Sequence, residues 1–185
     1  MELIDVLLPD GTPAGIRKTK DEIHRDGDWH RSVHVWITTP GGLLLLQRRS
    51  LEKENHPGLW DISAAGHLSA GEDSIAAAVR EVEEEIGLRI APRELRFLAT
   101  LRESFVLNEG AYLDNEIHDV FVVTREVDPE ALVLQPGEVD EVALADPSSL
   151  FERPLVPHDE EYALILRVAG DQNASPGASE SGLPP

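Results

Sequence analysis

The chain has 185 residues and no cysteine, and its 35 acidic residues outnumber its 16 basic ones, giving a formal charge of −19. The absence of cysteine excludes disulfides, thiolate metal sites and a cysteine nucleophile. The negative charge makes duplex nucleic acid and anionic membranes poor partners. No apolar run is long enough for a membrane-spanning helix, and the acidic N-terminus is unlike a signal peptide. We therefore expect a cytoplasmic protein.

The N-terminal half of the chain favours strands. Residues 2–8 and 14–17 flank an Asp-Gly pair, which is typical of a hairpin. The β-rich residues 31–39 and the leucine-rich residues 43–48 are separated by Pro-Gly-Gly and predict two further strands. After a polar loop, residues 60–64 are expected to form a short extended segment.

One strong helical pattern covers residues 72–87. Its larger apolar side chains recur at i, i+4, i+7 and i+11 and form one stripe: Ile75, Val79, Val82 and Ile86. The glycine that closes the pattern is a typical stop signal. We expect the stripe to pack against the sheet and the opposite helix face to remain free.

The C-terminal half predicts strands at 95–103, 117–125 and 138–144 and a final helix at 157–168. Strands interrupted by two helices indicate a layered α/β domain with a mixed sheet. Residues 171–185 are rich in Ser, Gly and Pro and offer little to bury, so we expect a disordered tail.

The predicted helix and the loop before it carry the most informative residues: Gly66, Glu72, Arg80, Glu81, Glu84, Glu85 and Gly87. Three of the glutamates crowd within one turn, on the face away from the apolar stripe. Like charges at this spacing repel, and a hard divalent cation such as Mg²⁺ would relieve the repulsion. We expect Ala77 to leave this face open for a ligand and Arg80 to orient Glu84. The plainer interpretation is a solvated acidic helix surface, which leaves the glycines unexplained.

This pattern, over residues 66–88, resembles the Nudix box, the signature of the Nudix hydrolase superfamily, at every fixed position. The resemblance implies an α/β/α sandwich with a central mixed β-sheet. The order of strands resembles the family from about residue 30 to 168. The length of the chain fits one domain, which we expect over residues 1–170, with the predicted hairpin lying within residues 1–20. Relatives that dimerise through this hairpin region make a homodimer one expected arrangement.

The same resemblance implies a hydrolase that cleaves a diphosphate bond in a nucleoside diphosphate-linked or related organic diphosphate. The implied cofactor is Mg²⁺, with Mn²⁺ as its substitute. By correspondence, Glu81, Glu84 and Glu85 would bind the metal, and Ala65 would add its backbone carbonyl. The substrate stays open among CDP- or ADP-linked compounds, nucleoside triphosphates, thiamine diphosphate and prenyl diphosphates.

Segments around the box resemble the isopentenyl-diphosphate isomerase branch of the superfamily: Gln47-Arg48-Arg49-Ser50, Pro57-Gly58-Leu59-Trp60, Ala65-Gly66-His67 and Asp114-Asn115-Glu116. This resemblance implies a second metal site made of His30, His67, Asp114 and Glu116. His24 matches the pattern less well, because its spacing differs by one residue. The resemblance also implies that Arg49 and Lys53 hold the substrate diphosphate.

The chain departs from that branch at one decisive position. The isomerases have a cysteine directly before the Gly-His pair, where this chain has Ala65. Without the thiol, allylic proton transfer lacks one of its two partners, which favours a hydrolase. Glu116 is the expected proton acceptor or additional ligand, and Glu103 is its competitor. The alternatives are an isomerase-like enzyme and a non-catalytic nucleotide-binding sensor.

Several of these residues also have plainer interpretations. His67 could brace the glycine loop, and His30 and His34 could be structural residues of a strand. Lys53 could simply be exposed to solvent. Arg48 and Arg49 point to opposite faces of their strand, so only one of them can face a substrate.

Overall fold

The computed structural model describes residues 2–173. Within that range the strands form one nine-stranded sheet. The strands are β1 (Leu3–Leu7), β2 (Pro13–Thr19), β3 (Trp29–Thr38), β4 (Leu44–Arg49), β5 (Trp60–Asp61), β6 (Ala64–His67), β7 (Arg96–Leu107), β8 (Tyr112–Thr124) and β9 (Val139–Ala145). The helices are α1 (Lys20–Asp26), α2 (Ser74–Ile86) and α3 (Asp159–Asn173), and the 3₁₀ turns are η1 (Pro92–Glu94), η2 (Asn108–Gly110), η3 (Pro129–Ala131) and η4 (Pro147–Glu152).

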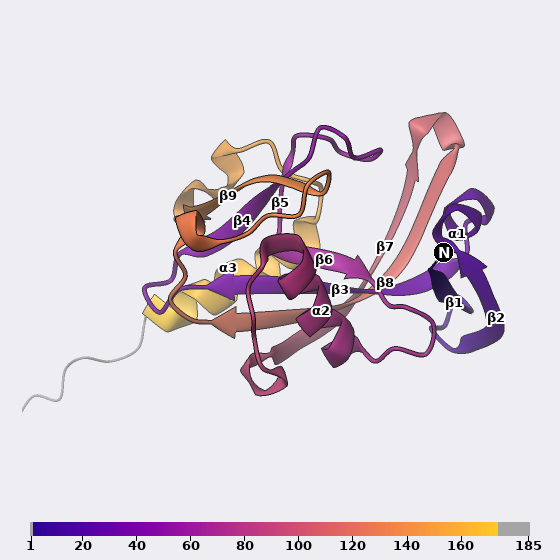
Figure 1. Ribbon diagram of the computed structural model, residues 1–185, viewed down its shortest axis with the longest axis horizontal. Helices are drawn as coiled ribbons and strands as arrows, with labels where there is room; N and C mark the ends of the chain where they lie inside the picture. Colours follow the sequence, from indigo (N-terminus) through magenta and orange to yellow (C-terminus); the bar gives the residue numbers. More distant parts are fainter. Residues whose placement is uncertain (1, 174–185) are drawn as a thin grey trace, which may run out of the picture.

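Strand β3 is the centre of the sheet (Figure 1). One of its edges pairs in parallel with β8, from Trp29 opposite Asn115 to Thr38 opposite Thr124. The other edge pairs in succession with β1, β6 and β4, all antiparallel. The predicted mixed sheet is therefore confirmed. Because β3 is shared by so many neighbours, polar residues along it are brought next to residues from distant parts of the chain.

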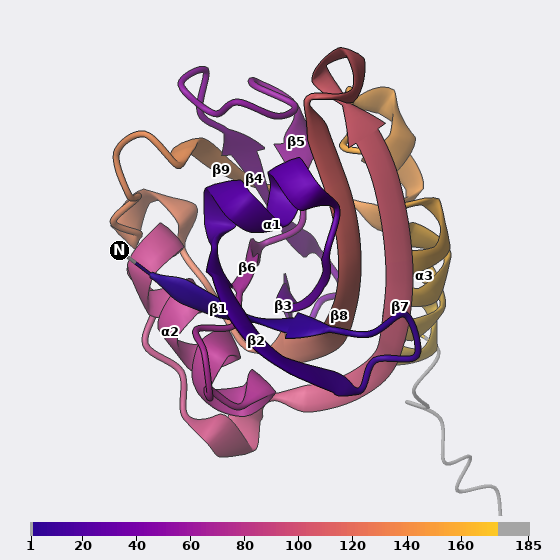
Figure 2. The ribbon, with the colours of Figure 1, turned by 90° about the vertical axis from the view of Figure 1, so that its right-hand side faces the viewer.

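Helices α2 and α3 cover opposite faces of the sheet (Figure 2). Side chains alternate along β3, so that Val33 and Val35 pack with Val82 of α2. Trp36, on the other face of the strand, packs with Ile165 of α3. The layered α/β architecture expected from the sequence is thus observed, with a separate apolar core under each helix.

The ends of α2 follow its sequence signals. The Asp73 side chain accepts hydrogen bonds from the N–H groups of Ile75 and Ala76, both at 3.0 Å. At the other end, Gly87 adopts a left-handed conformation with φ of 68° and closes the helix. The helix was predicted to begin at residue 72 and instead begins at 74, because Asp73 is its N-cap.

The predicted apolar stripe of α2 is partly wrong. Ile75 is 45% exposed, whereas Ala77 lies fully buried in the core instead of lining an open face. The buried residues of the helix are Ala77, Ala78, Val82, Glu85 and Ile86. The small alanines let α2 lie flat on the sheet, which turns Glu85 inward beside Ile86 rather than to the opposite side.

Helix α1 has no counterpart among the predicted elements. Thr19 and Glu22 form a capping box in which each side chain accepts from the other's backbone N–H. Gly27, with φ of 70°, ends the helix after two turns. The capping box and the glycine were the available sequence signals. The omission matters because α1 carries His24, which is buried.

Strands β7 and β8 are longer than predicted, whereas β9 is shifted by one residue. Strands β7 and β8 form a hairpin that closes at Leu107 opposite Tyr112, and its tip stands out from the body of the sheet (Figure 1). The added part of β8 carries Asp114 and Glu116, which a prediction of 117–125 left outside the strand.

Helix α3 is shifted toward the C-terminus from its predicted span and runs from 159 to 173, so three residues assigned to the tail are helical. The remainder of the predicted tail, 174–185, lies outside the described residues. In the described part of the chain, no helix combines the length and apolar character needed to cross a membrane.

Candidate active site

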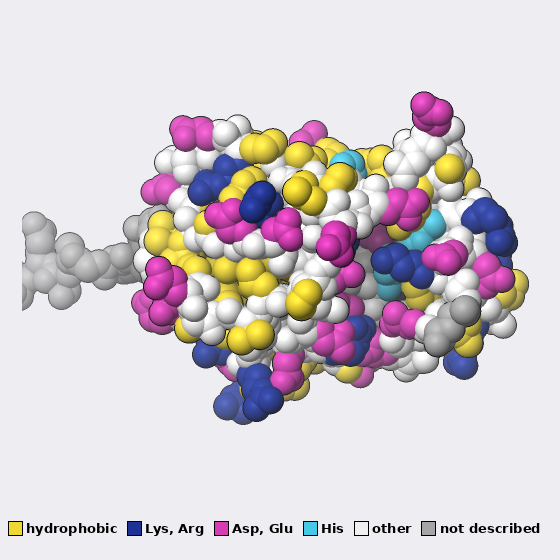
Figure 3. Space-filling model, turned by 45° about the horizontal axis from the view of Figure 1, so that its top comes forward, with side chains coloured by type: hydrophobic (Ala, Val, Ile, Leu, Met, Phe, Trp, Pro, Cys, Tyr) yellow, Lys and Arg dark blue, Asp and Glu magenta, His cyan; other side chains and the backbone are white. Residues whose placement is uncertain are grey.

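A cavity of about 340 Å³ lies between α2, the β7–β8 hairpin and the loop that follows β4. In Figure 3 it appears as a hollow in which histidine and basic side chains lie below a rim of Asp and Glu. Its walls include most of the predicted site residues: Arg49, Lys53, Ala65, His67, Glu81, Glu84, Glu85, Asp114 and Glu116. His30 is fully buried and does not belong to the wall.

The carboxylate of Glu81 lies directly over Gly66. A Cβ atom at Gly66 would overlap that carboxylate, so the position of the Glu81 carboxylate over the loop requires glycine here. Arg80 donates to Glu81 at 2.6 Å, to Glu84 at 3.1 Å and to Glu72 at 2.8 Å. Arg80 therefore orients Glu84 as expected, and orients two further carboxylates with it.

Glu85 is buried at the inner end of the same helix face, with 5% of its surface exposed. Its Oε2 atom accepts from the side-chain amide of Gln47 and from the backbone N–H of Ala65, both at 3.0 Å. Burial raises the pKa of Glu85 to about 7, with Lys53 opposing the shift and Glu81 adding to it. The predicted metal-binding role of the Ala65 carbonyl stays a prediction.

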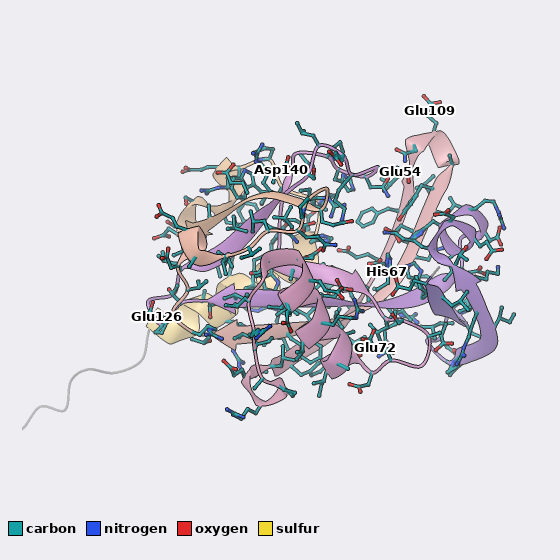
Figure 4. The ribbon with its side chains drawn as sticks, in the orientation of Figure 1. Glu54, His67, Glu72, Glu109, Glu126 and Asp140 are labelled. Atoms are coloured by element: carbon teal, nitrogen blue, oxygen red, sulfur yellow. The ribbon has the colours of Figure 1, made fainter. Side chains whose placement is uncertain are left out.

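Within residues 2–173, two groups of His and acidic side chains gather their ligand atoms within 4.8 Å, and neither contains Glu81, Glu84 or Glu85. One group consists of His24, His30, His67 and Glu116. The Oδ1 atom of Asp114 adjoins it, 3.3 Å from Nε2 of His24. The residues predicted for a second metal site are thus brought together, and helix α1 adds His24. Figure 4 shows His67 extending from β6 toward the β7–β8 hairpin.

The donor atoms of this histidine group suit a divalent cation. Nδ1 of His24 lies 2.8 Å from the Lys20 carbonyl, and Nδ1 of His30 lies 3.1 Å from the Asp28 carbonyl. A carbonyl can only accept, so each Nδ1 carries a proton, and Nε2 is the ring atom available to a cation after loss of any second proton. Both Nε2 atoms, with Oδ1 of Asp114, are buried and have no hydrogen-bond partner among the described residues.

Glu116 is held at the centre of the group. It accepts a hydrogen bond from the Ser32 hydroxyl at 3.0 Å and lies 3.0 Å from Nε2 of His67. Burial opposes its ionisation, but the imidazoles of His30 and His67 outweigh burial and hold the pKa of Glu116 well below its usual range. Its competitor Glu103 bonds to a different histidine, His158, at 2.8 Å.

The two predicted diphosphate-binding cations also reach the cavity. Arg49 donates to Asp61 at 3.0 Å and to the backbone carbonyl of Asn55. Lys53 pairs with Glu138 and is only 19% exposed, so the solvent-exposed interpretation is wrong. Arg48 points away and pairs with Glu141, so one of the two arginines faces the cavity, as the strand alternation requires.

Residues 28–166 match the family model described as the NUDIX domain. The chain belongs to the Nudix family. It is 44% identical over 146 residues to Nudix hydrolase 3 of Arabidopsis thaliana, covering 76% of this chain and 19% of that protein. It is 33% identical over 153 residues to an isopentenyl-diphosphate Delta-isomerase of Streptomyces griseus, covering 83% of this chain and 74% of the isomerase. The chain thus spans only about a fifth of the Arabidopsis relative.

Solved structures show the same fold. A crystal structure from Deinococcus radiodurans superposes with a TM-score of 0.67 at 21% identity, covering 90% of this chain and 98% of that one. The NUDIX domain of Shewanella oneidensis NrtR, crystallised with ADP ribose, gives a TM-score of 0.59 at 15% identity, covering 75% and 86%. Nudix hydrolases generally cleave diphosphate bonds with the help of divalent metals, and residues 28–166 of this chain form a domain of that family.

Sequence reasoning missed a second buried polar group in this Nudix domain, made of His34, His118 and Glu161. Glu161 of α3 accepts from the Trp36 indole at 2.6 Å and from Nδ1 of His34 at 2.7 Å. The rings of His34 and His118 stack with their centroids 4.1 Å apart. Stacked rings cannot aim their in-plane lone pairs at one ion, so we assign Glu161 to anchoring α3 on the sheet. Its partners lie 125 and 127 positions away in the sequence, so no pattern among neighbouring residues could have predicted these contacts.

Replacing Gly66 with alanine tests the contact between loop and helix. The new methyl group would displace the flexible end of Glu81 rather than the backbone, so the melting temperature should stay close to that of the wild type. We expect kcat to fall about tenfold or more, because the carboxylate moves away from its position over the loop. Gly170→Ala is the matched control, since its Cβ meets no other atom within 4 Å. Full activity in Gly66→Ala would contradict the assigned position of Glu81.

Proposed function

We propose that this protein is a divalent-metal-dependent hydrolase of a diphosphate bond in a nucleoside diphosphate-linked or related organic diphosphate. One observation carries the proposal: Glu81, Glu84 and Glu85 line the same cavity as Arg49 and Lys53. Carboxylates suited to a hard cation therefore face side chains suited to an anion.

The residues present fit the metal that the family uses. Glu81 and Glu85 are held in the cavity wall, and the raised pKa of Glu85 shows a buried carboxylate that a cation would stabilise in its ionised form. The histidine group around Glu116, with its orphaned donor atoms, would hold a second ion. When bound, divalent cations offset the charge of the diphosphate and acidify the attacking water.

The side chains of the chain itself would perform the remaining steps. Arg49 and Lys53 would hold the diphosphate oxygens, since both cations face the cavity. A carboxylate must take up the proton of the attacking water. Glu84 is the best placed, because its side chain is 53% exposed and Arg80 is its only partner within the described residues. The contacts of Glu116 with two imidazoles favour its role as a ligand.

The decisive experiment is incubation with MgCl₂ and a panel of diphosphates. The panel should contain CDP- and ADP-linked compounds, nucleoside triphosphates, thiamine diphosphate and prenyl diphosphates. We expect phosphate-containing cleavage products from at least one class, detected by phosphorus NMR. Binding without cleavage of any member would identify a sensor, and rearrangement without cleavage would identify an isomerase.

An isomerase is the second candidate, because the histidine group matches the isomerase branch and the isomerase of Streptomyces griseus is 33% identical. Ala65 argues against it, since no cysteine stands anywhere in the chain. We expect Ala65→Cys to show at most trace isomerisation, because the glutamates on α2 remain in place to direct the diphosphate elsewhere. Proton exchange between prenyl diphosphate and heavy water, followed by NMR, measures this. Efficient isomerisation by the wild type would overturn the hydrolase proposal.

A further inference from the structure

Four charged side chains from four separate segments form a chain of contacts along one wall of the cavity. Glu103 of β7 bonds to Nδ1 of His158 at 2.8 Å, and Nε2 of His158 lies 3.3 Å from Oδ1 of Asp61. The other oxygen of Asp61 accepts from Arg49 at 3.0 Å. All four residues line the cavity. Arg49, at the end of this series, is the residue proposed to hold the diphosphate.

His158 is fixed by backbone pairing of the segment before α3. The N–H of Trp60 donates to the Pro154 carbonyl, and the N–H of Val156 donates back to the Trp60 carbonyl, both at 2.9 Å. His158 then donates its own N–H to the Val156 carbonyl at 3.0 Å and is only 8% exposed. The ring therefore has little freedom, and it enters the wall at the strand that carries Asp61.

The charges along the series alternate. Burial opposes protonation of His158, but the hydrogen bonds with Asp61 and Glu103 raise its pKa well above the usual range. Burial likewise opposes ionisation of Asp61, yet His158 and Arg49 hold its pKa well below the usual range. With a cationic His158, each anion has a cation beside it. Without that cation, Glu103 would lose the cation beside it, Asp61 would keep only Arg49, and the wall facing an anionic substrate would carry one more negative charge.

We propose that His158 is a positioning residue for the anionic substrate, because it holds the Asp61 carboxylate that in turn aims the Arg49 guanidinium into the cavity. This inference rests on the proposed function. The second hold on Arg49, from the Asn55 carbonyl, belongs to the loop after β4, so Asp61 supplies the only contact from the sheet among the described residues. Losing the sheet contact leaves the guanidinium tied to a loop.

Two variants separate positioning from net charge. His158→Phe keeps a flat ring but removes both contacts and one positive charge. Asp61→Asn keeps the shape but removes one negative charge and the ion pair with Arg49. The two variants alter the wall charge in opposite directions, yet both break the series. Positioning therefore predicts that both weaken anion binding, whereas a pure charge effect predicts that Asp61→Asn strengthens it.

The experiment is titration calorimetry of the full chain with inorganic pyrophosphate in MgCl₂. We expect the Kd to rise about tenfold in His158→Phe and in Asp61→Asn, as for loss of a charge-assisted contact. His158→Gln, which can keep one of the two contacts, should recover part of the affinity. Tyr162→Phe is the matched control. It removes a hydrogen bond to the Val156 carbonyl in the same segment, and should lower the melting temperature without changing the Kd.

Wild-type affinity in His158→Phe, or tighter binding in Asp61→Asn, would overturn the inference, as would equal weakening in Tyr162→Phe. If His158→Phe fails to fold, His158→Gln and Asp61→Asn decide the matter. Absence of pyrophosphate binding by the wild type would also overturn it. The proposed function is judged separately, by cleavage of the substrate panel, so a protein that binds pyrophosphate but cleaves nothing would refute only the hydrolase assignment.

Discussion

Glu81→Gln and Glu85→Gln should each lower kcat at least about a hundredfold at saturating magnesium. Each change removes a negative charge from the cavity wall while keeping the size of the side chain, so packing is preserved. Glu81 lies over Gly66, and Glu85 is fixed by Gln47 and the N–H of Ala65. An amide in either position cannot supply the charge that a hard cation requires.

Glu83→Gln on the same helix is the matched control for both changes. Its side chain points to solvent and pairs with Arg89 at 2.7 Å, outside the cavity. Steady-state kinetics on any cleaved member of the substrate panel should give near wild-type kcat for this control. If Glu81→Gln and Glu85→Gln also turned over at the wild-type rate, the metal-binding role of the helix would be wrong.

Glu85 should also make the stability of the metal-free protein depend on pH. Its pKa is about 7 in the folded state, against 4.5 for an exposed glutamate, so the folded state holds the proton more tightly than the unfolded chain. The stabilising effect of the protonated form is complete below about pH 4.5 and is lost as the pH rises to about 7. At 1.36 kcal/mol per pKa unit, the loss amounts to about 3 kcal/mol.

The measurement is the melting temperature in EDTA, relative to Glu85→Gln, across that pH range. The difference between the two proteins should grow in favour of the glutamine variant as the pH rises from about 4.5 to 7. Glu83→Gln should follow the wild type, because the exposed Glu83 lacks the burial that shifts Glu85. A constant difference between wild type and Glu85→Gln at every pH would show that the carboxyl does not titrate as assigned.

The elements of the fold were predictable where a signal lies within a few neighbouring residues. The end of α2 at Gly87 and the hairpin around Asp10-Gly11 depend on turn and capping chemistry that the sequence displays directly. Which side chains of α2 pack against the sheet was not predictable in the same way. The periodicity treats Ile75 as core because it is large, but Ala77 and Ala78 bring the helix close to the sheet, and Ile75 is left at the exposed end.

The same distinction, between residues close in the sequence and residues brought together by the fold, applies to the candidate site. Glu81, Glu84 and Glu85 are neighbours on one helix, so their grouping in the cavity wall could be anticipated. His24 was predicted only as a weaker match, because it lies on α1, a helix that the predicted elements did not include although Thr19 and Glu22 form a capping box. The contacts of His158 with Asp61 and Glu103 join elements that pack together only in the finished fold, and no spacing in the chain encodes them.

The parallel pairing of β3 with β8 also determines the stage of folding at which the histidine group can form. Ser32 and its acceptor Glu116 are 84 positions apart in the chain, and their strands meet only after the whole of α2 and β7 has been made. Contacts of such long sequence separation are the slow ones in folding, because the loop between them must be closed first. During synthesis, α1 and β3 leave the ribosome before β8. His24 and His30 therefore lack their acidic partner at that stage. The complete group of histidine and acidic side chains therefore forms only when β8 pairs with β3.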